Sequence, residues 1–287
     1  IQLIGFAGRH KVAPQDAYQP PINVEQLFLS GAALYESSMR FGFPKVEQAT
    51  GQVDLLHCTS IIPFANKSKM VATIHDLAFL KYPQFFSRRG NSVFRRSLKI
   101  LLERADVLLC SSQSTLEDCA EYGFSRDRLE HVPLGVVAPM VMTSQDQVKT
   151  RYKLPDEYLL FVGTLEPRKN LSQLIDALEI LGDSVPDLVV VGSTGWGDVP
   201  EAENLTSKTK TRVHFAGFVQ PSDLGAIYAG AQVLCYPSLM EGFGLPILEA
   251  LALRTNVVTT SVGIVPEVFQ EHPGRIALSN PISFHSV

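Results

Sequence analysis

The chain has 287 residues, which is enough for two α/β domains of ordinary size. Hydrophobic residues make up 45% and charged residues 19%, and the formal net charge is −4, so the composition lacks the basic surplus of nucleic-acid-binding domains. No apolar run approaches the roughly 20 residues of a membrane span, and the first residues carry no signal-peptide pattern. We therefore expect a cytoplasmic protein with no nucleic-acid partner.

The cysteines are scattered along the chain and form no CxxC pair: Cys58, Cys110, Cys119 and Cys235. Three of them lie in or beside apolar runs, where a buried thiol is the ordinary outcome. We therefore expect buried free thiols, no metal site and a reducing cellular setting.

From Val53 on, short apolar runs alternate with helical patterns, which predicts parallel βαβ units. A helix is predicted over 114–122, closed by Gly123. The strands predicted in this first half are 53–57, 70–75, 106–111 and 129–133.

The stretch 136–156 has no clear periodicity and carries Pro139 and Pro155, which is typical of a connection between domains. We therefore place the boundary near residue 150, with one Rossmann-like domain over 1–150 and a second over 151–287.

The second half opens with a predicted strand at 158–162 and a helix that runs from Asn170, the expected N-cap, to Gly182. Further elements alternate in the same way: strands at 188–191, 213–216, 232–236 and 257–259, and helices at 222–228 and 246–253. This order predicts a doubly wound parallel sheet, whose ligands bind beyond the carboxyl ends of the strands.

The strongest local signal is the segment SLMEGFGLPILEA, residues 238–250. Its glycines Gly242 and Gly244 let the backbone approach a ligand, and the helix start at Pro246 favours an anion such as a diphosphate. Glu241 in the loop and Glu249 one turn inside the helix can accept hydrogen bonds from sugar or ribose hydroxyls. We expect neither carboxylate in the apolar core.

This segment resembles the Glu-x7-Glu signature of the large retaining glycosyltransferase family four, the group 1 glycosyltransferases. Four other segments resemble the same family in the same order along the chain: DLLHCTSIIP…VATIHDLAF, HVPLGV, FVGTLEPRKNLSQLIDAL and VHFAGFVQPSDLGAIYAGAQVLCYPS. The resemblance implies the GT-B fold, two Rossmann-like domains facing across a cleft, with the acceptor on the first and the nucleotide sugar on the second. From comparison with the family, we expect the chain to lack the first strand with its glycine-rich loop, and we expect the match to fade after Val268.

The resemblance assigns roles residue by residue. Glu249 matches the ribose-binding carboxylate, and Glu241 matches the carboxylate beside the donor sugar and its phosphates. The backbone around them is expected to bind the donor, namely Gly242, Phe243, Gly244 and Leu245. Three further residues match the loop that flanks the nucleotide base: Gly217, Phe218 and Val219.

The loop GTLEPRKN supplies the cations that a departing diphosphate needs as it gains charge. Arg168 and Lys169 are the candidates, with Lys169 the expected principal phosphate contact. Gly163 and Thr164 open the loop and are expected at the donor. Many relatives carry an arginine where Thr164 stands, so the division of the phosphates between Arg168 and Lys169 stays open.

Two histidines are the last residues of predicted strands. The resemblance places His75, in the family's HD loop, opposite the donor sugar, whereas for His57 the family pattern leaves substrate contact open.

Residues 88–104 carry six cations and one acid with apolar residues interleaved, a pattern found in peripheral membrane helices and in solvated helix faces. Relatives that act on lipid-linked acceptors keep a peripheral membrane contact open.

The expected reaction is transfer of a hexose from a nucleoside-diphosphate sugar, GDP-mannose first, to a glycan or lipid-linked acceptor, with retention and with neither a metal nor a cofactor. One alternative is a non-catalytic or incomplete member of the family. A remote one is a dinucleotide-binding oxidoreductase, which Ile247 at the third glycine of a GxGxxG pattern disfavours.

Overall fold

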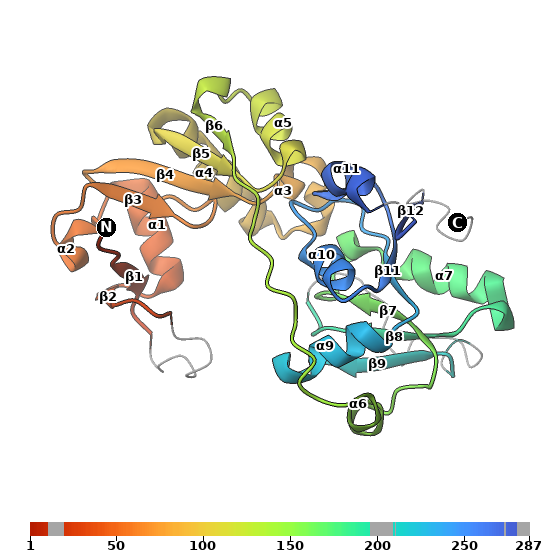
Figure 1. Ribbon diagram of the computed structural model, residues 1–287. Helices are drawn as coiled ribbons and strands as arrows, with labels where there is room; N and C mark the ends of the chain where they lie inside the picture. Colours follow the sequence, from red (N-terminus) through yellow and green to blue (C-terminus); the bar gives the residue numbers. More distant parts are fainter. Residues whose placement is uncertain (11–19, 196–208, 210, 273, 280–287) are drawn as a thin grey trace. The chain divides into compact units, whose positions relative to one another are not determined.

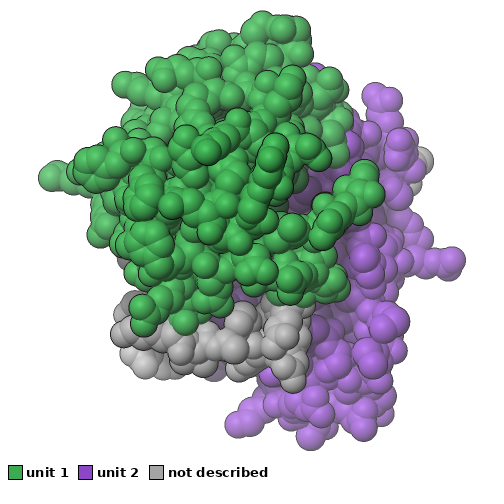
Figure 2. All heavy atoms as spheres, turned by 90° about the vertical axis from the view of Figure 1, so that its left-hand side faces the viewer, with its two compact units in different colours: residues 1–83, 87–111, 115–132 green, residues 84–86, 112–114, 133–287 purple. Residues whose placement is uncertain are grey.

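The computed structural model describes residues 1–10, 20–195, 209, 211–272 and 274–279. The chain forms two compact units, coloured separately in Figure 2. The first comprises residues 1–83, 87–111 and 115–132, and the second comprises 84–86, 112–114 and 133–287. The boundary expected near residue 150 falls inside helix α6 (Gln145–Tyr152), which belongs to the second unit and packs against α9 (Pro221–Gly230).

The first unit contains two parallel sheets (Figure 1). The larger has the order β3-β4-β5-β6, with β3 at Leu55–Cys58, β4 at Lys69–Ile74, β5 at Val107–Cys110 and β6 at Leu129–His131. The smaller pairs β1 (Gly5–Gly8) with β2 (Val24–Leu27). The helices in the described part of this unit are α1 (Gly31–Phe41), α2 (Glu47–Thr50), α3 (Ala78–Lys81), α4 (Arg88–Arg104) and α5 (Gln113–Tyr122).

Two strands that were not predicted, β1 and β2, precede Val53, where the predicted alternation begins. Both strands have only four residues and are largely half-buried or exposed, so they lack the long apolar run of a strand buried on both faces. The four strands predicted in the first half are confirmed to within two residues at each end.

The second unit is built on one six-stranded parallel sheet with the order β12-β11-β10-β7-β8-β9. Its strands are β7 (Tyr158–Val162), β8 (Asp187–Val191), β9 (Val213–Gly217), β10 (Val233–Tyr236), β11 (Asn256–Thr259) and β12 (Ile276–Leu278). Its further helices are α7 (Leu171–Leu181), α10 (Leu245–Ala252) and α11 (Val265–Val268).

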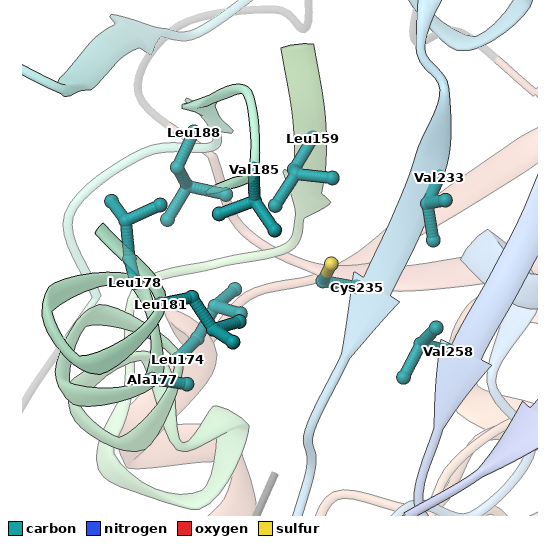
Figure 3. A pocket seen from close by; sticks show the side chains of 10 residues that line it. All are labelled: Leu159, Leu174, Ala177, Leu178, Leu181, Val185, Leu188, Val233, Cys235 and Val258. Carbon is teal, nitrogen blue, oxygen red and sulfur yellow. The ribbon is translucent and has the colours of Figure 1, made fainter. Parts of the chain in front are cut away.

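Both faces of this sheet are buried, which confirms the doubly wound prediction. Alternate side chains of β8 point to opposite faces: Val189 packs with the α6, α9 and α10 side, and Val190 with the α7 side. The strand is therefore a continuous apolar run. On the α7 side a hollow of about 210 Å³ opens between the helix and the sheet (Figure 3). Its lining contains no charged side chain: Leu159, Leu174, Ala177, Leu178, Leu181, Val185, Leu188, Val233, Cys235 and Val258.

One local prediction is wrong: helix α6 lies inside the stretch predicted to be a connection, and a capping box between Ser144 and Gln147 begins it. Asn170 is the N-cap residue of α7, as predicted, but it adopts a left-handed conformation and its side chain makes no capping hydrogen bond. Its amide instead donates to the Pro237 carbonyl, at 3.2 Å.

Candidate active site

The order of the strands in the second unit defines a switch point. From β7 the chain proceeds to β8 and β9 on one side, and then returns to place β10 on the other side of β7. The loops that follow β7 and β10 therefore lie next to each other at the carboxyl ends of the strands. In open parallel sheets this is where ligands bind.

Hydrogen bonds join these two loops directly. The Leu239 amide donates to the Arg168 carbonyl at 2.8 Å. In the opposite direction, the Arg168 guanidinium donates to the Met240 carbonyl at 3.1 Å. The carbonyl of Pro237 accepts the Asn170 bond described above, so the β7 loop is held to the β10 loop along its length.

A buried ionic cluster lies at this junction. Lys169 Nζ is 2.7 Å from Glu241 Oε1, and an Arg168 Nη atom is 3.1 Å from Glu241 Oε2. On its other side, Arg168 Nε is 2.6 Å from Glu166 Oε1. Lys169 also donates to the hydroxyl of Tyr236 at 2.9 Å. The structure therefore brings together Arg168, Lys169 and Glu241, which sequence reasoning selected independently.

The expectation that Glu241 lies outside the core is wrong, because only 7% of the residue is exposed. Burial acts to raise the pKa of Glu241, but the charges of Lys169 and Arg168 outweigh it and hold that pKa below its ordinary value. Glu241 is thus ionised at neutral pH. Burial raises the pKa of the Tyr236 hydroxyl well above its ordinary value, so Tyr236 stays protonated.

Glycines line the adjoining strand ends. Gly163 donates to the Val191 carbonyl at 3.0 Å, and Gly192 donates to the Gly217 carbonyl at 2.9 Å, so the ends of β7, β8 and β9 are linked in a row. A Cβ atom on Gly192 would lie 1.9 Å from the Gly163 carbonyl oxygen, which no side chain permits. Beside Gly163, the exposed Thr164 begins the loop that carries the cations.

The start of α10 is set by Gly244, whose φ of 98° lies in the left-handed region that favours glycine. Gly242 and Phe243 are buried, while Leu245 is exposed. The Phe243 carbonyl accepts from Ile264 at 2.8 Å, which secures the loop from its outer side.

Glu249 is half-buried on α10 and accepts a hydrogen bond from the Tyr228 hydroxyl at 2.7 Å. Burial raises the pKa of Tyr228 well above its ordinary value, so this hydroxyl remains a donor. The bond fixes one carboxylate oxygen of Glu249.

The loop after β9 presents an exposed Phe218 beside a buried Val219. Tyr152 of α6 holds the end of this loop, because its hydroxyl accepts from the Gln220 amide at 3.3 Å and donates to Asp223 at 2.7 Å. Helix α6 therefore supports a loop that sequence reasoning assigned to the nucleotide base.

His75 and His57 belong to the first unit. His75 follows β4; its side chain is 3.2 Å from the Thr59 carbonyl, and its own carbonyl accepts from the hydroxyls of Ser111 and Thr115. His57 Nε2 is 2.8 Å from the Thr73 hydroxyl, and burial lowers the pKa of His57, which leaves it neutral at pH 7. His75 is exposed at the end of its strand.

Sequence reasoning missed three residues at the junction: Glu166, Tyr236 and Gly192. Two of them could have been found from the local sequence. Glu166 lies beside two cations in the motif, and Gly192 directly follows the apolar run of β8. Tyr236 had no such local signal, because its contact with Lys169 depends on the pairing of β7 with β10.

The described residues contain no cluster of three or more His, Cys, Asp or Glu side chains that could hold a metal ion. None of the helices in the described ranges is long and apolar enough to cross a membrane. All four cysteines are buried and free, whereas burial was predicted for the three that lie in or beside apolar runs.

Several solved structures share the fold of this chain. Sucrose-phosphate synthase from Thermosynechococcus elongatus aligns over 99% of this chain and 77% of its own, with a TM-score of 0.72 and 22% identity. HepE from Anabaena, solved in complex with UDP-glucose, aligns over 92% of this chain and 74% of its own, with a TM-score of 0.66 and 18% identity. The fold of the chain is therefore GT-B.

Two family models cover nearly the whole sequence: Glycosyltransferase Family 4 matches residues 6–138, and Glycosyl transferases group 1 matches residues 143–281. The chain belongs to this glycosyltransferase family. The second match continues past Val268, where the resemblance was expected to fade.

Curated relatives carry related names. O-antigen chain mannosyltransferase B of Escherichia coli is 31% identical over 223 residues, which are 75% of this chain and 58% of the relative. D-inositol 3-phosphate glycosyltransferase of Corynebacterium glutamicum is 29% identical over 69% of this chain and 51% of its own. The chain thus spans between half and two thirds of the length of these two relatives.

Replacement of Gly192 tests the close packing of the strand ends. We expect Gly192→Ala to separate β8 from the β7 loop and to lower the thermal midpoint, because the added methyl group meets a backbone carbonyl. Gly135→Ala is the matched control, since a Cβ there meets nothing within 4 Å. Differential scanning fluorimetry compares the two; equal midpoints would contradict the argument.

Proposed function

We propose that the protein is a retaining glycosyltransferase that moves a hexose, mannose first, from a nucleoside-diphosphate sugar to an acceptor hydroxyl. The observation that carries the proposal is the ionic cluster of Arg168, Lys169 and Glu241 at the switch point of the second unit. Cations there suit a diphosphate, and a carboxylate beside them suits sugar hydroxyls.

The chemistry follows from the charges. As the glycosidic bond breaks, negative charge develops on the diphosphate, and Arg168 and Lys169 stabilise it in a site already shielded from water. They take the role that a metal ion plays elsewhere. The departing phosphate oxygen accepts the proton of the acceptor hydroxyl, so retention needs no separate base. His75 of the first unit is proposed to orient the sugar with Glu241.

The donor is proposed to be GDP-mannose, because the loop GTLEPRKN and the names of several relatives favour mannosyl transfer. UDP-glucose is the first competitor, since HepE was solved with that donor. No cofactor is proposed beyond the donor itself.

A thermal-shift panel tests the donor. At 100 times its dissociation constant a ligand stabilises a protein by about 2.7 kcal/mol, so GDP-mannose should raise the midpoint more than UDP-glucose or ADP-glucose. The shift should persist in EDTA, as should release of GDP during transfer. Stabilisation by UDP-glucose alone would overturn the mannose assignment, and activity that EDTA abolishes and manganese restores would overturn the metal-independent mechanism.

The two signature carboxylates should separate kinetically. Glu249 binds ribose equally in ground and transition states, so Glu249→Gln should chiefly raise the donor KM. Glu241→Gln, which keeps the shape of a buried side chain, should lower kcat at least 10-fold, about 1.4 kcal/mol. Steady-state kinetics with varied donor measure both. An unchanged kcat in Glu241→Gln would show that Glu241 is remote from the reacting bond.

The acceptor is proposed to be a glycan or a lipid-linked sugar, and the protein to be cytoplasmic with a peripheral membrane contact through α4. The apolar side of α4 packs inside the first unit. Leu98 and Leu101 are fully buried, and the ring centroids of Phe94 and Phe79 are 5.2 Å apart. Contact with lipid therefore rests on the exposed cations of the other face: Arg88, Arg89, Arg95 and Lys99.

Vesicle binding tests this contact. Because each cation near an anionic surface contributes roughly 1 kcal/mol, reversal of Arg95 and Lys99 to Glu should weaken binding to phosphatidylserine vesicles about 10-fold or more. Reversal of Lys67 and Lys153, two exposed cations outside α4, makes the same charge change and should have less effect. Sedimentation that is equal in both double variants would remove α4 from the membrane contact.

A further inference from the structure

Four charged side chains at the switch point alternate in sign. Glu166 pairs with Arg168, Arg168 pairs also with Glu241, and Glu241 pairs with Lys169. Their formal charges sum to zero when all four are ionised. The cations that should hold a diphosphate are thus already neutralised by carboxylates.

A donor diphosphate brings at least two negative charges into this cluster. Such a charge is stable in a buried site only when cationic charge is left over to pair with it. Glu241 cannot leave easily, because both of its oxygens are held by cations, at 2.7 and 3.1 Å. The remaining carboxylate is Glu166.

Glu166 is held far less firmly than Glu241. It is only 3% exposed, one oxygen contacts Arg168, and the other oxygen is buried with no hydrogen-bond partner among the described residues. An ionised carboxylate oxygen without a donor is costly in such a place. Burial accordingly raises the pKa of Glu166, against the pull of Arg168 and Lys169.

Among the described residues, the other ionisable groups around Glu166 do not compete for a proton at neutral pH. Tyr236 is already protonated, and the charges of Lys169 and Arg168 keep Glu241 ionised in spite of its burial. The residues directly after β8 that bridge to this loop, 192–195, carry no ionisable side chain.

We propose that binding of a nucleoside diphosphate is coupled to uptake of one proton by Glu166, which frees Arg168 from its ion pair and leaves a net cation for the phosphates. The proton comes from solvent and forms an O–H bond on the carboxylate of Glu166; no other bond changes. Glu166 therefore acts through Arg168 as a positioning residue. This inference rests on the proposed function of the same site.

The sign of the pH dependence follows. At low pH Glu166 is protonated before the ligand arrives, so affinity does not change with pH. As pH rises above the pKa of free Glu166, each binding event must take up a proton, and affinity falls by up to 10-fold per pH unit, the limit for one coupled proton.

Calorimetry with GDP as the probe tests the coupling. At about pH 8 the terminal phosphate of GDP is fully ionised, since its second pKa is about 6, so uptake reports on the protein. Titrations in buffers of different ionisation heat should show net proton uptake by the wild type. Glu166→Gln should abolish that uptake and make GDP affinity independent of pH.

Two further variants sharpen the result. Glu166→Asp keeps a carboxyl group and should restore a pH-dependent affinity, which a purely structural role of Glu166 does not explain. Glu121→Gln removes an exposed carboxylate of the first unit and should leave proton uptake unchanged.

The outcomes separate this inference from the proposed function. Failure of the wild type to bind GDP, UDP and ADP would overturn the proposed function. GDP binding by the wild type without proton uptake, or the same uptake in Glu166→Gln, would overturn the coupling alone. If Glu166→Gln does not fold, the wild-type affinity for GDP decides by itself: no fall between about pH 7.5 and pH 9, where the phosphate of GDP is already ionised, excludes a coupled proton.

Discussion

The ionic contact of Glu241 with Arg168 and Lys169 is the constraint on which the rest of the second unit's ligand-binding edge depends. It joins loops that are more than sixty residues apart in sequence and places three charges in a region shielded from water. Removal of one partner would leave one buried charge of the cluster uncompensated, which costs more than the pair contributes. The contact is therefore better understood as a device that fixes geometry than as a source of stability.

Parallel strands make that contact possible. Because β10 pairs with β7, the turn Pro167–Lys169 and the segment beginning at Ser238 emerge at the same edge of the sheet. Gly192 contributes by its lack of a side chain, since only glycine lets β8 approach the Gly163 carbonyl. The sheet thus positions the loops after β7 and β10, and these loops carry the charged side chains.

Much of this arrangement was predictable from sequence, for a physical reason. Strands buried on both faces are continuous apolar runs, and β7 was predicted with its observed bounds. Elements with weaker patterns were missed: β1 and β2 are short and incompletely buried, and α6 buries only Val148. Even so, Ser144 and Gln147 held a readable capping box that marks the start of α6.

The residues of the site were predictable from the sequence, but the ion pairs between them were not. The types and order of Arg168, Lys169 and Glu241 were sufficient to select them, yet each was expected to face the ligand rather than its neighbours. Burial of Glu241 follows from the sheet order, which no local pattern reports. Glu166 was missed for the same reason, because the sequence does not report that its carboxylate pairs with Arg168.

The absence of an arginine at Thr164 fits this picture. Thr164 is exposed at the start of the loop and carries no charge. In the described part of the chain, the cations at the junction are Arg168 and Lys169, and both contact the same carboxylate, that of Glu241. Lys169 is a compact charge held between Glu241 and Tyr236, whereas Arg168 has a planar fork that can pair on two sides at once. Arg168 is therefore the cation that can exchange a carboxylate for a phosphate without leaving Glu241, and the charge state of Glu166 decides when it does so.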